Sequence, residues 1–202
     1  MKNAFKPLLI CWFVSGLCVA AIAEQQIIDK QPPPPPPPAD DYFPKRWKEF
    51  VSQEAAFRVL LPGSPKLSTS TPQSGAPIIR EFTYSGVIKH EIVLVEYPSN
   101  EDPSKAKALF DSYCDTALSV RQSEIAKIVK ETDFSLGGHP GKFFQIELTG
   151  GTVVRFKFIL SKNRVYILTA TSRKAQPNVM GSENDYQEIA MAFLDSFQLT
   201  MP

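Results

Sequence analysis

Few side chains in this sequence are of the types that carry out acid–base or nucleophilic chemistry. The chain has two histidines, His90 and His139, and three cysteines, Cys11, Cys18 and Cys114. A zinc site needs three or four His, Cys, Asp or Glu ligands close together, and these positions are far apart in the sequence. The Gly-x-Ser-x-Gly motif of many serine hydrolases is also missing from the chain. We therefore expect no catalytic residue, no metal ligand and no cofactor, and a protein that is not an enzyme.

The segment LGGHPGKFF has the glycine content of a phosphate-binding loop but not its spacing. A P-loop places two glycines five residues apart and follows the second with Lys and then Ser or Thr. Here Gly137 is four residues before Gly141, and Phe143 follows Lys142 where a hydroxyl would bind magnesium. The segment also precedes a strand pattern, so no helix N-terminus would face a phosphate. Its composition instead predicts a turn between two strands.

Three residues of that turn have expected roles. Gly137 or Gly138 is expected to adopt a positive φ, and Pro140 to fix the direction in which the chain returns. His139 lies in the turn and is the histidine that we expect to be exposed. A role for it as an acid or base would require a nucleophile in the same cleft.

The remaining reactive side chains have structural explanations. The carboxylate pairs Asp40–Asp41 and Glu101–Asp102 lie in a loop and at the start of a predicted helix, where solvation or N-capping accounts for them. Cys114 lies on the apolar stripe of that helix, eight residues after Ala106. This spacing predicts a buried thiol rather than a nucleophile.

The N-terminus has the pattern of a secretory signal peptide. Lys2 and Lys6 precede the apolar run Leu8–Ala23, which ends in the small-x-small sequence Ala-Ile-Ala. We predict a signal peptide over residues 1–23, cleaved before Glu24, and a periplasmic or secreted mature protein. The alternative is a retained anchor, although a run of 16 residues is shorter than the roughly 17–25 that span a bilayer.

Charge and cysteine content limit the partners of the mature chain. Removing Lys2 and Lys6 from 22 basic residues leaves 20 against 21 acidic ones, a formal charge of −1. Nucleic-acid binding needs clustered positive charge, so we expect no nucleic acid as partner. With the leader removed, Cys114 is the one remaining cysteine, so an internal disulfide is excluded. We expect another envelope protein as the partner and no membrane span after cleavage.

Residues 24–44 are predicted to form a proline-rich linker before a folded domain over residues 45–202. Pro32–Pro38 are consecutive and form polyproline II, a stiff rod about 3.1 Å long per residue. We favour a spacer that holds the domain away from a membrane or wall. A ligand for an aromatic-lined groove is the alternative.

The sequence pattern of the domain predicts several strands and two helices, which together indicate an α+β fold. The first helix opens at Asp102-Pro103 and the second near Ser182, each with an apolar stripe at helical spacing. The predicted strands are Phe57–Leu61, the segments IIREFTYSG and KHEIVLVEY, the polar strand Ile125–Leu136, and three more in GKFFQIELTG, VVRFKFILS and RVYILTATS.

The last three strands form a predicted antiparallel meander. A three-residue turn at Gly150-Gly151-Thr152 pairs Phe144 with Phe158, Ile146 with Phe156 and Leu148 with Val154; on the reverse face it pairs Glu147 with Arg155 and Gln145 with Lys157. A two-residue turn at Lys162-Asn163, with positive φ at the asparagine, pairs Leu160 with Val165 and Phe158 with Ile167. The first face is expected to carry helices. The second, with Ile159, Tyr166 and Leu168 beside charged residues, is either covered or a binding surface.

Several motifs together resemble a known set of exported bacterial domains. The motifs are FRVLLPGSPK, EFTYSG, LGGHPGKFF, RFKFILSKNRVYILTA and AMAFLDSFQL. They resemble domains related in fold to the PsbP extrinsic subunit of photosystem II and to the Ran-binding Mog family, over Trp47 to Leu199. The resemblance implies an α/β/α sandwich around an antiparallel sheet, used for binding or assembly rather than catalysis, and it transfers no site residue.

These observations favour an exported, non-enzymatic binding or accessory module that contacts another envelope protein. The alternative is a carrier that holds a small apolar ligand between helix and sheet. A hydrolase that the motifs do not reveal is the third hypothesis.

Overall fold

The computed structural model describes residues 46–70, 77–86, 88–97, 103–119, 124–173 and 183–200. All of them lie in the compact unit Pro37–Pro202. The predicted signal peptide and linker, the pairs Asp40–Asp41 and Glu101–Asp102, and the helix-capping Ser182 lie outside the described residues.

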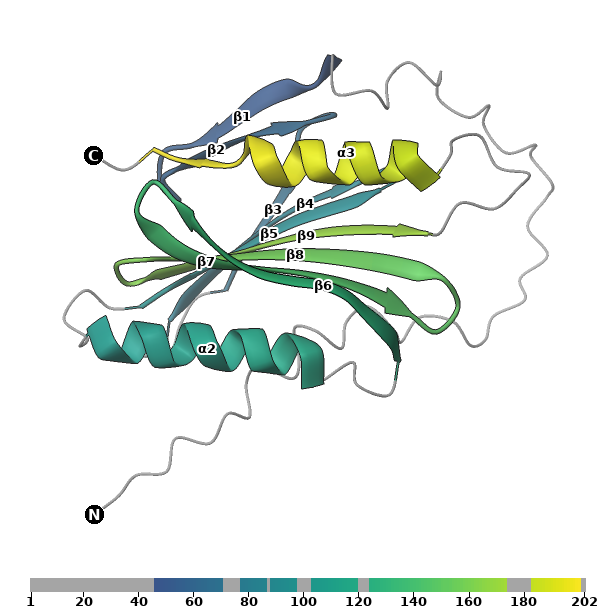
Figure 1. Ribbon diagram of the computed structural model, residues 1–202. Helices are drawn as coiled ribbons and strands as arrows, with labels where there is room; N and C mark the ends of the chain where they lie inside the picture. The colour runs from purple at the N-terminus through teal and green to yellow at the C-terminus, as the bar shows by residue number, and fades with distance from the viewer. Residues whose placement is uncertain are drawn as a thin grey trace, which may run out of the picture. The chain divides into compact units, whose positions relative to one another are not determined.

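The described chain forms two antiparallel sheets and two helices (Figure 1). The larger sheet has seven strands in the order β3-β4-β5-β9-β8-β7-β6, and the smaller has the order β1-β2-β10. The elements are β1 Lys48–Ser52, β2 Phe57–Leu61, β3 Lys66–Ser70, β4 Ile78–Ser85, β5 Lys89–Glu96, α2 Pro103–Ser119, β6 Ile125–Leu136, β7 His139–Leu148, β8 Thr152–Ser161, β9 Arg164–Arg173, α3 Glu183–Ser196 and β10 Gln198–Leu199.

The two helices cover opposite faces of the seven-stranded sheet (Figure 1). Helix α2 packs on β8 and β9. On the opposite face, helix α3 packs on β9 and also on β2. This arrangement confirms the predicted α+β class and the antiparallel sheet between helices. The three-stranded sheet was not predicted, because the sequence pattern did not indicate β1 and β10; β3, an edge strand of the larger sheet, was also not predicted. Neither described helix is both long and apolar enough to span a membrane.

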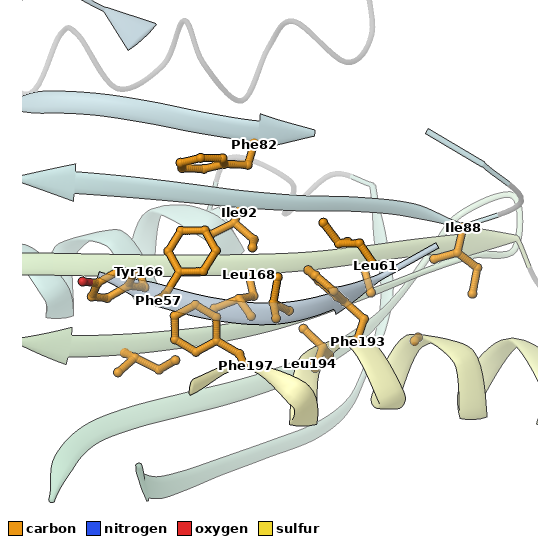
Figure 2. Packing of buried hydrophobic residues seen from close by; sticks show 14 of the residues in the cluster. Phe57, Leu61, Phe82, Ile88, Ile92, Tyr166, Leu168, Phe193, Leu194 and Phe197 are labelled. Carbon is orange, nitrogen blue, oxygen red and sulfur yellow. The ribbon is translucent and has the colours of Figure 1, made fainter. Parts of the chain in front are cut away.

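The second face of the sheet, with Ile159, Tyr166 and Leu168, is covered rather than a binding surface. Figure 2 shows one cluster of buried side chains. It contains Phe57 of β2, Tyr166 and Leu168 of β9, Phe193 of α3, and Phe197, the residue that follows α3. The Phe57 ring stacks on the Phe197 ring with 5.4 Å between centroids. Burial of aromatic side chains contributes much of the stability of such a core. This face of the sheet is therefore not a free surface where α3 and β2 lie.

The other face packs against α2 through the predicted stripe. Phe110 and Cys114 of α2 are buried against the sheet residues Phe144, Phe156 and Phe158. The rings of Phe156 and Phe158 stack with 5.9 Å between centroids. The three sheet phenylalanines share one face, as the alternating pattern predicts.

The register between β7 and β8 differs from the predicted one. Phe144 pairs with Phe156 rather than Phe158, and Ile146 pairs with Val154 rather than Phe156. The strands are thus displaced by two residues. Because side chains alternate with a period of two, an even displacement keeps every side chain on its predicted face.

Turn geometry explains this displacement. Gly150 and Gly151 have φ values of 100° and 79°, and the Gly151 N–H donates to the Leu148 carbonyl at 3.0 Å. In the turn Leu148–Gly151 the third residue is Gly150, and a positive φ at this position favours glycine. The turn is therefore centred on Thr149-Gly150, and β8 starts at Thr152. The predicted turn began one residue too late.

The reverse-face pairs change for the same reason. Gln145 lies opposite Arg155 and accepts a hydrogen bond from its Nε at 3.2 Å, and Glu147 lies opposite Val153. The predicted pairs Glu147 with Arg155 and Gln145 with Lys157 are therefore wrong.

The β8–β9 hairpin has the predicted pairs. Leu160 pairs with Val165 and Phe158 with Ile167 around the two-residue turn. Positive φ occurs at Lys162 (52°) and not at Asn163 as predicted. The Asn163 side chain instead donates to the Tyr97 carbonyl, which holds this turn against the end of β5.

The C-terminal end of α3 is capped from the sheet. The ammonium group of Lys157 in β8 donates to the Leu194 carbonyl at 3.0 Å and lies 3.1 Å from a carboxylate oxygen of Asp195. A cation at a helix C-terminus interacts favourably with the helix dipole. The chain then continues into β10, a short strand that the sequence did not predict, which pairs with β2.

Candidate functional site

The structure does not bring the candidate reactive residues together. His90 lies in β5 on the α3 side of the sheet, His139 begins β7 at the hairpin turn, and Cys114 lies in α2 and faces the opposite side of the sheet. Within the part of the chain that the structure describes, no group of three His, Cys, Asp or Glu side chains is placed to hold a metal ion.

His90 is a core residue. Its ring meets those of Trp47 and Phe193 edge-on, with centroid distances of 5.4 and 4.8 Å, and 2% of the residue is exposed. Neither imidazole nitrogen, nor the Trp47 indole nitrogen, has a hydrogen-bond partner among the described residues. Burial lowers the pKa of His90 to about 4. The imidazole is therefore neutral at pH 7, but the aromatic rings that enclose it leave no access for a diffusing substrate, which a general base would need.

Cys114 is equally unsuited to nucleophilic chemistry. Burial raises the pKa of its thiol to about 12, a change that the nearby Lys142 opposes only in part. The thiolate is the nucleophilic form, so the thiol is unreactive at neutral pH. The predicted buried thiol is confirmed.

The LGGHPG segment is the predicted strand–turn–strand connection. Gly137 and Gly138 both have positive φ, 58° and 84°, between β6 and β7. His139 pairs with Leu136 across the turn and is half-buried rather than exposed. The sequence alone did not reveal the role of the third glycine. A Cβ at Gly141 would lie 2.3 Å from the Phe134 ring, which covers the glycine from the adjacent strand.

A group of charged residues that sequence patterns did not reveal joins the sheet to the β1–β2 turn. Glu96 accepts hydrogen bonds from Arg80 at 2.8 Å and from Arg164 at 2.6 Å, and Arg80 also binds Glu54. Burial alone would raise the pKa of Glu96, but the two guanidinium groups lower it overall. The charges are matched with one another, so the network holds four segments together and offers no reactive group.

The free edge of β6 is the surface that stands out for binding. β6 has 12 residues and ends the strand order, so among the described strands it pairs with β7 alone. Eight consecutive residues, 126–133, are exposed, and they include the apolar side chains of Ile128 (48%) and Val129 (44%). We call residues Ile125–Leu136 with their unpaired side the β6 edge. An exposed strand edge presents N–H and C=O groups that another strand can pair with.

The first half of the β6 edge is irregular. The ladder to β7 shifts between Ile125 and Lys127 and again between Ile128 and Lys130, so that Ala126 and Val129 are extra residues. Bulges and lysines are devices that limit uncontrolled pairing of edge strands. The second half, from Lys130 to Leu136, pairs without interruption.

The two faces of the regular half carry different charges. Lys142 of β7 lies 3.5 Å from Glu131 and 3.8 Å from Asp133, over the Phe144 ring on the α2 side. Although burial lowers the pKa of Lys142, Asp133 and Glu131 raise it overall. Lys130 points to the other side, 5.7 Å from the Phe143 ring centroid. One ammonium group cannot neutralise two carboxylates, so the α2 side of the β6 edge keeps a net negative charge.

Comparison with known proteins gives likeness in fold. No family model matches the chain, and no curated protein matches it in sequence. Similar solved structures include cyanobacterial PsbP (CyanoP) from Synechocystis sp. PCC 6803, with 9% identity, a TM-score of 0.48, and coverage of 76% of this chain and 92% of that one. A protein of unknown function from Pseudomonas aeruginosa, PA94, has 20% identity, a TM-score of 0.37, and coverage of 73% and 94%.

A third similar structure is from Bacteroides thetaiotaomicron VPI-5482, with 11% identity and a TM-score of 0.38; the match covers 76% of this chain and 48% of that one. The chain is thus similar in fold to a PsbP protein, as its motifs predicted, while the resemblance to the Mog family stays a prediction. With identities of 20% or less and TM-scores below 0.5, these likenesses carry no argument about activity.

Proposed function

We propose that this chain is an exported, non-enzymatic binding module that contacts another protein of the cell envelope through the β6 edge. The observation that carries the proposal is the combination of an unpaired 12-residue strand with exposed Ile128 and Val129. An extended segment of a partner can add to such an edge, where main-chain hydrogen bonds supply affinity and alternate side chains supply specificity.

The other free edge of the seven-stranded sheet is a poorer candidate. β3 has five residues, Lys66–Ser70, and its one large exposed apolar residue is Leu67. A partner strand on β3 would therefore form fewer than half of the main-chain pairs that β6 offers. Leu67, 59% exposed, provides a matched control position for experiments on β6.

Export follows from the predicted signal peptide, and the linker of residues 24–44 would hold the domain at a distance from its attachment. N-terminal sequencing of the protein isolated from the envelope fraction tests this part. A mature N-terminus at Glu24 agrees with it, and a cytoplasmic protein that retains Met1 contradicts it.

The carrier and hydrolase hypotheses rank lower. On the α2 side the described side chains are in contact with one another, with Phe110 and Cys114 against the stacked Phe156 and Phe158 rings. A carrier would need a cavity of several hundred Å³ at this place. A hydrolase would need a nucleophile and a base in contact, whereas His90 and Cys114 lie on opposite sides of the sheet.

Site-specific photo-crosslinking in cells tests the binding edge. A photoreactive amino acid replaces Val129 in one strain and Leu67 in a second, and adducts are compared after irradiation. We expect one predominant protein adduct from Val129 that the Leu67 strain does not give. The adduct should weaken when the second half of the edge is altered by Glu131→Lys and Asp133→Lys. Absence of an adduct at Val129, or the same adducts from Leu67, would contradict the proposal.

A further inference from the structure

The charge pattern of the β6 edge indicates the charge of the strand that it binds. This inference rests on the proposal above that the β6 edge is the binding surface. The regular half reads Lys130-Glu131-Thr132-Asp133-Phe134. Glu131 and Asp133 lie on the α2 side, because both contact Lys142 over the Phe144 ring. Their side chains are 51% and 83% exposed, so both remain accessible to an incoming strand.

A second copy of the same chain is a poor occupant. Two copies of β6 that pair antiparallel about a two-fold axis normal to the sheet must place one residue opposite its own copy, because residues directly opposite share a face. Centring on Lys130, Glu131 or Asp133 sets that charge against itself. Centring on Thr132 sets Glu131 of each copy against Asp133 of the other. Like charges directly opposite destabilise a strand pair.

The symmetric centres on either side of this stretch, Val129 and Phe134, are also unfavourable. Val129 is an extra residue outside the regular ladder, so a pair centred there lacks continuous hydrogen bonding. A pair centred on Phe134 runs into the turn at Gly137 and leaves only a few residues of each strand paired. For these centres, a strand of different composition fits the edge better than its own copy does.

We propose that the β6 edge binds an extended segment of another protein that carries Lys or Arg at two alternate positions, facing Glu131 and Asp133. The ammonium or guanidinium groups of such a segment would lie on the α2 side, where Lys142 leaves a carboxylate uncompensated. The residue between the two basic positions points to the other face, beside Thr132, where a β-branched side chain fits the pleated surface.

Further carboxylates lie toward the same side. The charges of Asp111 and Asp115 in α2, like that of Asp133 in β6, raise the pKa of the Cys114 thiol in α2. Lys107 binds Asp111, so this helix face is not wholly acidic. Lys127 and Lys130 flank the apolar pair Ile128–Val129 at the irregular end. The attraction for a basic strand is therefore localised at the second half of β6.

Labelled peptides test this specificity on the purified protein by fluorescence anisotropy. The probe is a seven-residue capped peptide with Val and Thr at most positions and Lys at two alternate positions; its matched control has Glu at those two positions. We expect the Lys peptide to bind about tenfold tighter, because two cross-strand charge pairs change from attractive to repulsive. Methylation of the backbone nitrogens of the Lys peptide should abolish binding, since it removes the strand hydrogen bonds.

Three variants complete the experiment, each checked for folding by circular dichroism. Glu131→Gln with Asp133→Asn should remove the preference, and Glu131→Lys with Asp133→Lys should reverse it. Ser68→Lys in β3 should leave it unchanged. Equal binding of both peptides, a preference that survives the charge reversal, or disulfide-linked dimers of a Val129→Cys variant would overturn the inference. An adduct at Val129 in cells with no preference between the peptides would refute this specificity alone, whereas no adduct would refute the binding edge itself.

Discussion

The imidazole of His90 meets the ring of Phe193 edge-on at 4.8 Å, inside a core that offers it no charged neighbour among the described residues. His90 thereby joins β5 to α3 as a neutral aromatic group. Both of its nitrogens are buried without a hydrogen-bond partner among the described residues, so protonation of the ring would place an unpaired charge in this core.

Protonation of His90 should make stability depend on pH. Its pKa is about 4 in the folded protein against 6.5 when unfolded, so the unfolded state binds more protons between these values. The free energy of unfolding should fall as pH falls from 6.5 to 4, by about 3 kcal/mol in total. Urea unfolding at several pH values measures this change. In a His90→Phe variant the decrease in this window should be smaller by that amount, and an unchanged pH dependence would rule the explanation out.

Cys114 should be inert to thiol reagents until the protein unfolds. Burial raises its pKa to about 12 from a reference value of 9.0, which lowers the thiolate fraction roughly a thousandfold at pH 8. The rate of labelling by a chromogenic disulfide reagent should therefore be slow in buffer and fast in denaturant. A Cys114→Ala variant identifies any signal from other cysteines. Rapid labelling of Cys114 in the folded protein would show that α2 does not pack this residue against the sheet.

Gly141 should be required because of the ring that covers it. A methyl group there would lie 2.3 Å from Phe134 Cζ, so Gly141→Ala should destabilise the protein by about 1–3 kcal/mol. In a Phe134→Ala background the same substitution should cost much less, which a double-mutant cycle of unfolding free energies measures. Equal costs in both backgrounds would mean that the ring is not the cause.

Lys157 should stabilise α3 from the sheet. Lys157→Met keeps much of the side-chain volume but removes the ammonium group from the Leu194 carbonyl and from Asp195, and we expect a loss of about 1–2 kcal/mol in thermal unfolding. Asp195→Asn should cost less, because its carboxylate is 62% exposed and Lys157 keeps the carbonyl. A larger effect of Asp195→Asn than of Lys157→Met would contradict the capping role.

Strong local patterns predicted most of the fold. β2, β4, β5, β7, β8 and β9 have alternating or continuous apolar residues, and both helices have apolar stripes, while β6 was predicted as a polar strand. The strands that were missed, β1 with KEFVS, β3 with KLSTS and β10 with QL, are short and mostly polar. They form because a neighbouring strand pairs with them, which is a tertiary effect that local propensity does not contain. The β7–β8 register was wrong because the prediction began the glycine turn one residue too late.

The candidate site could be predicted only in part. The polar composition of Ile125–Leu136 indicated an exposed strand, but not that it ends the sheet, because strand order depends on pairs distant in sequence. The Arg80–Glu96–Arg164 network was missed for the same reason, since the Arg164 and Glu96 partners are 68 positions apart. The exclusion of a Cys114 nucleophile was predictable because a helical stripe is a local signal.

Backbone hydrogen exchange at the β6 edge tests most directly whether it accepts a basic strand. Exchange is followed by NMR with and without the peptide that carries two alternate lysines, and β3 serves as the internal reference edge. We expect the outward-facing amides of residues 130–134 to exchange more slowly when the peptide is bound, and the amides of β3 to be unchanged. Slower exchange in β3 instead, or no change along β6 at saturating peptide, would contradict the proposed binding edge.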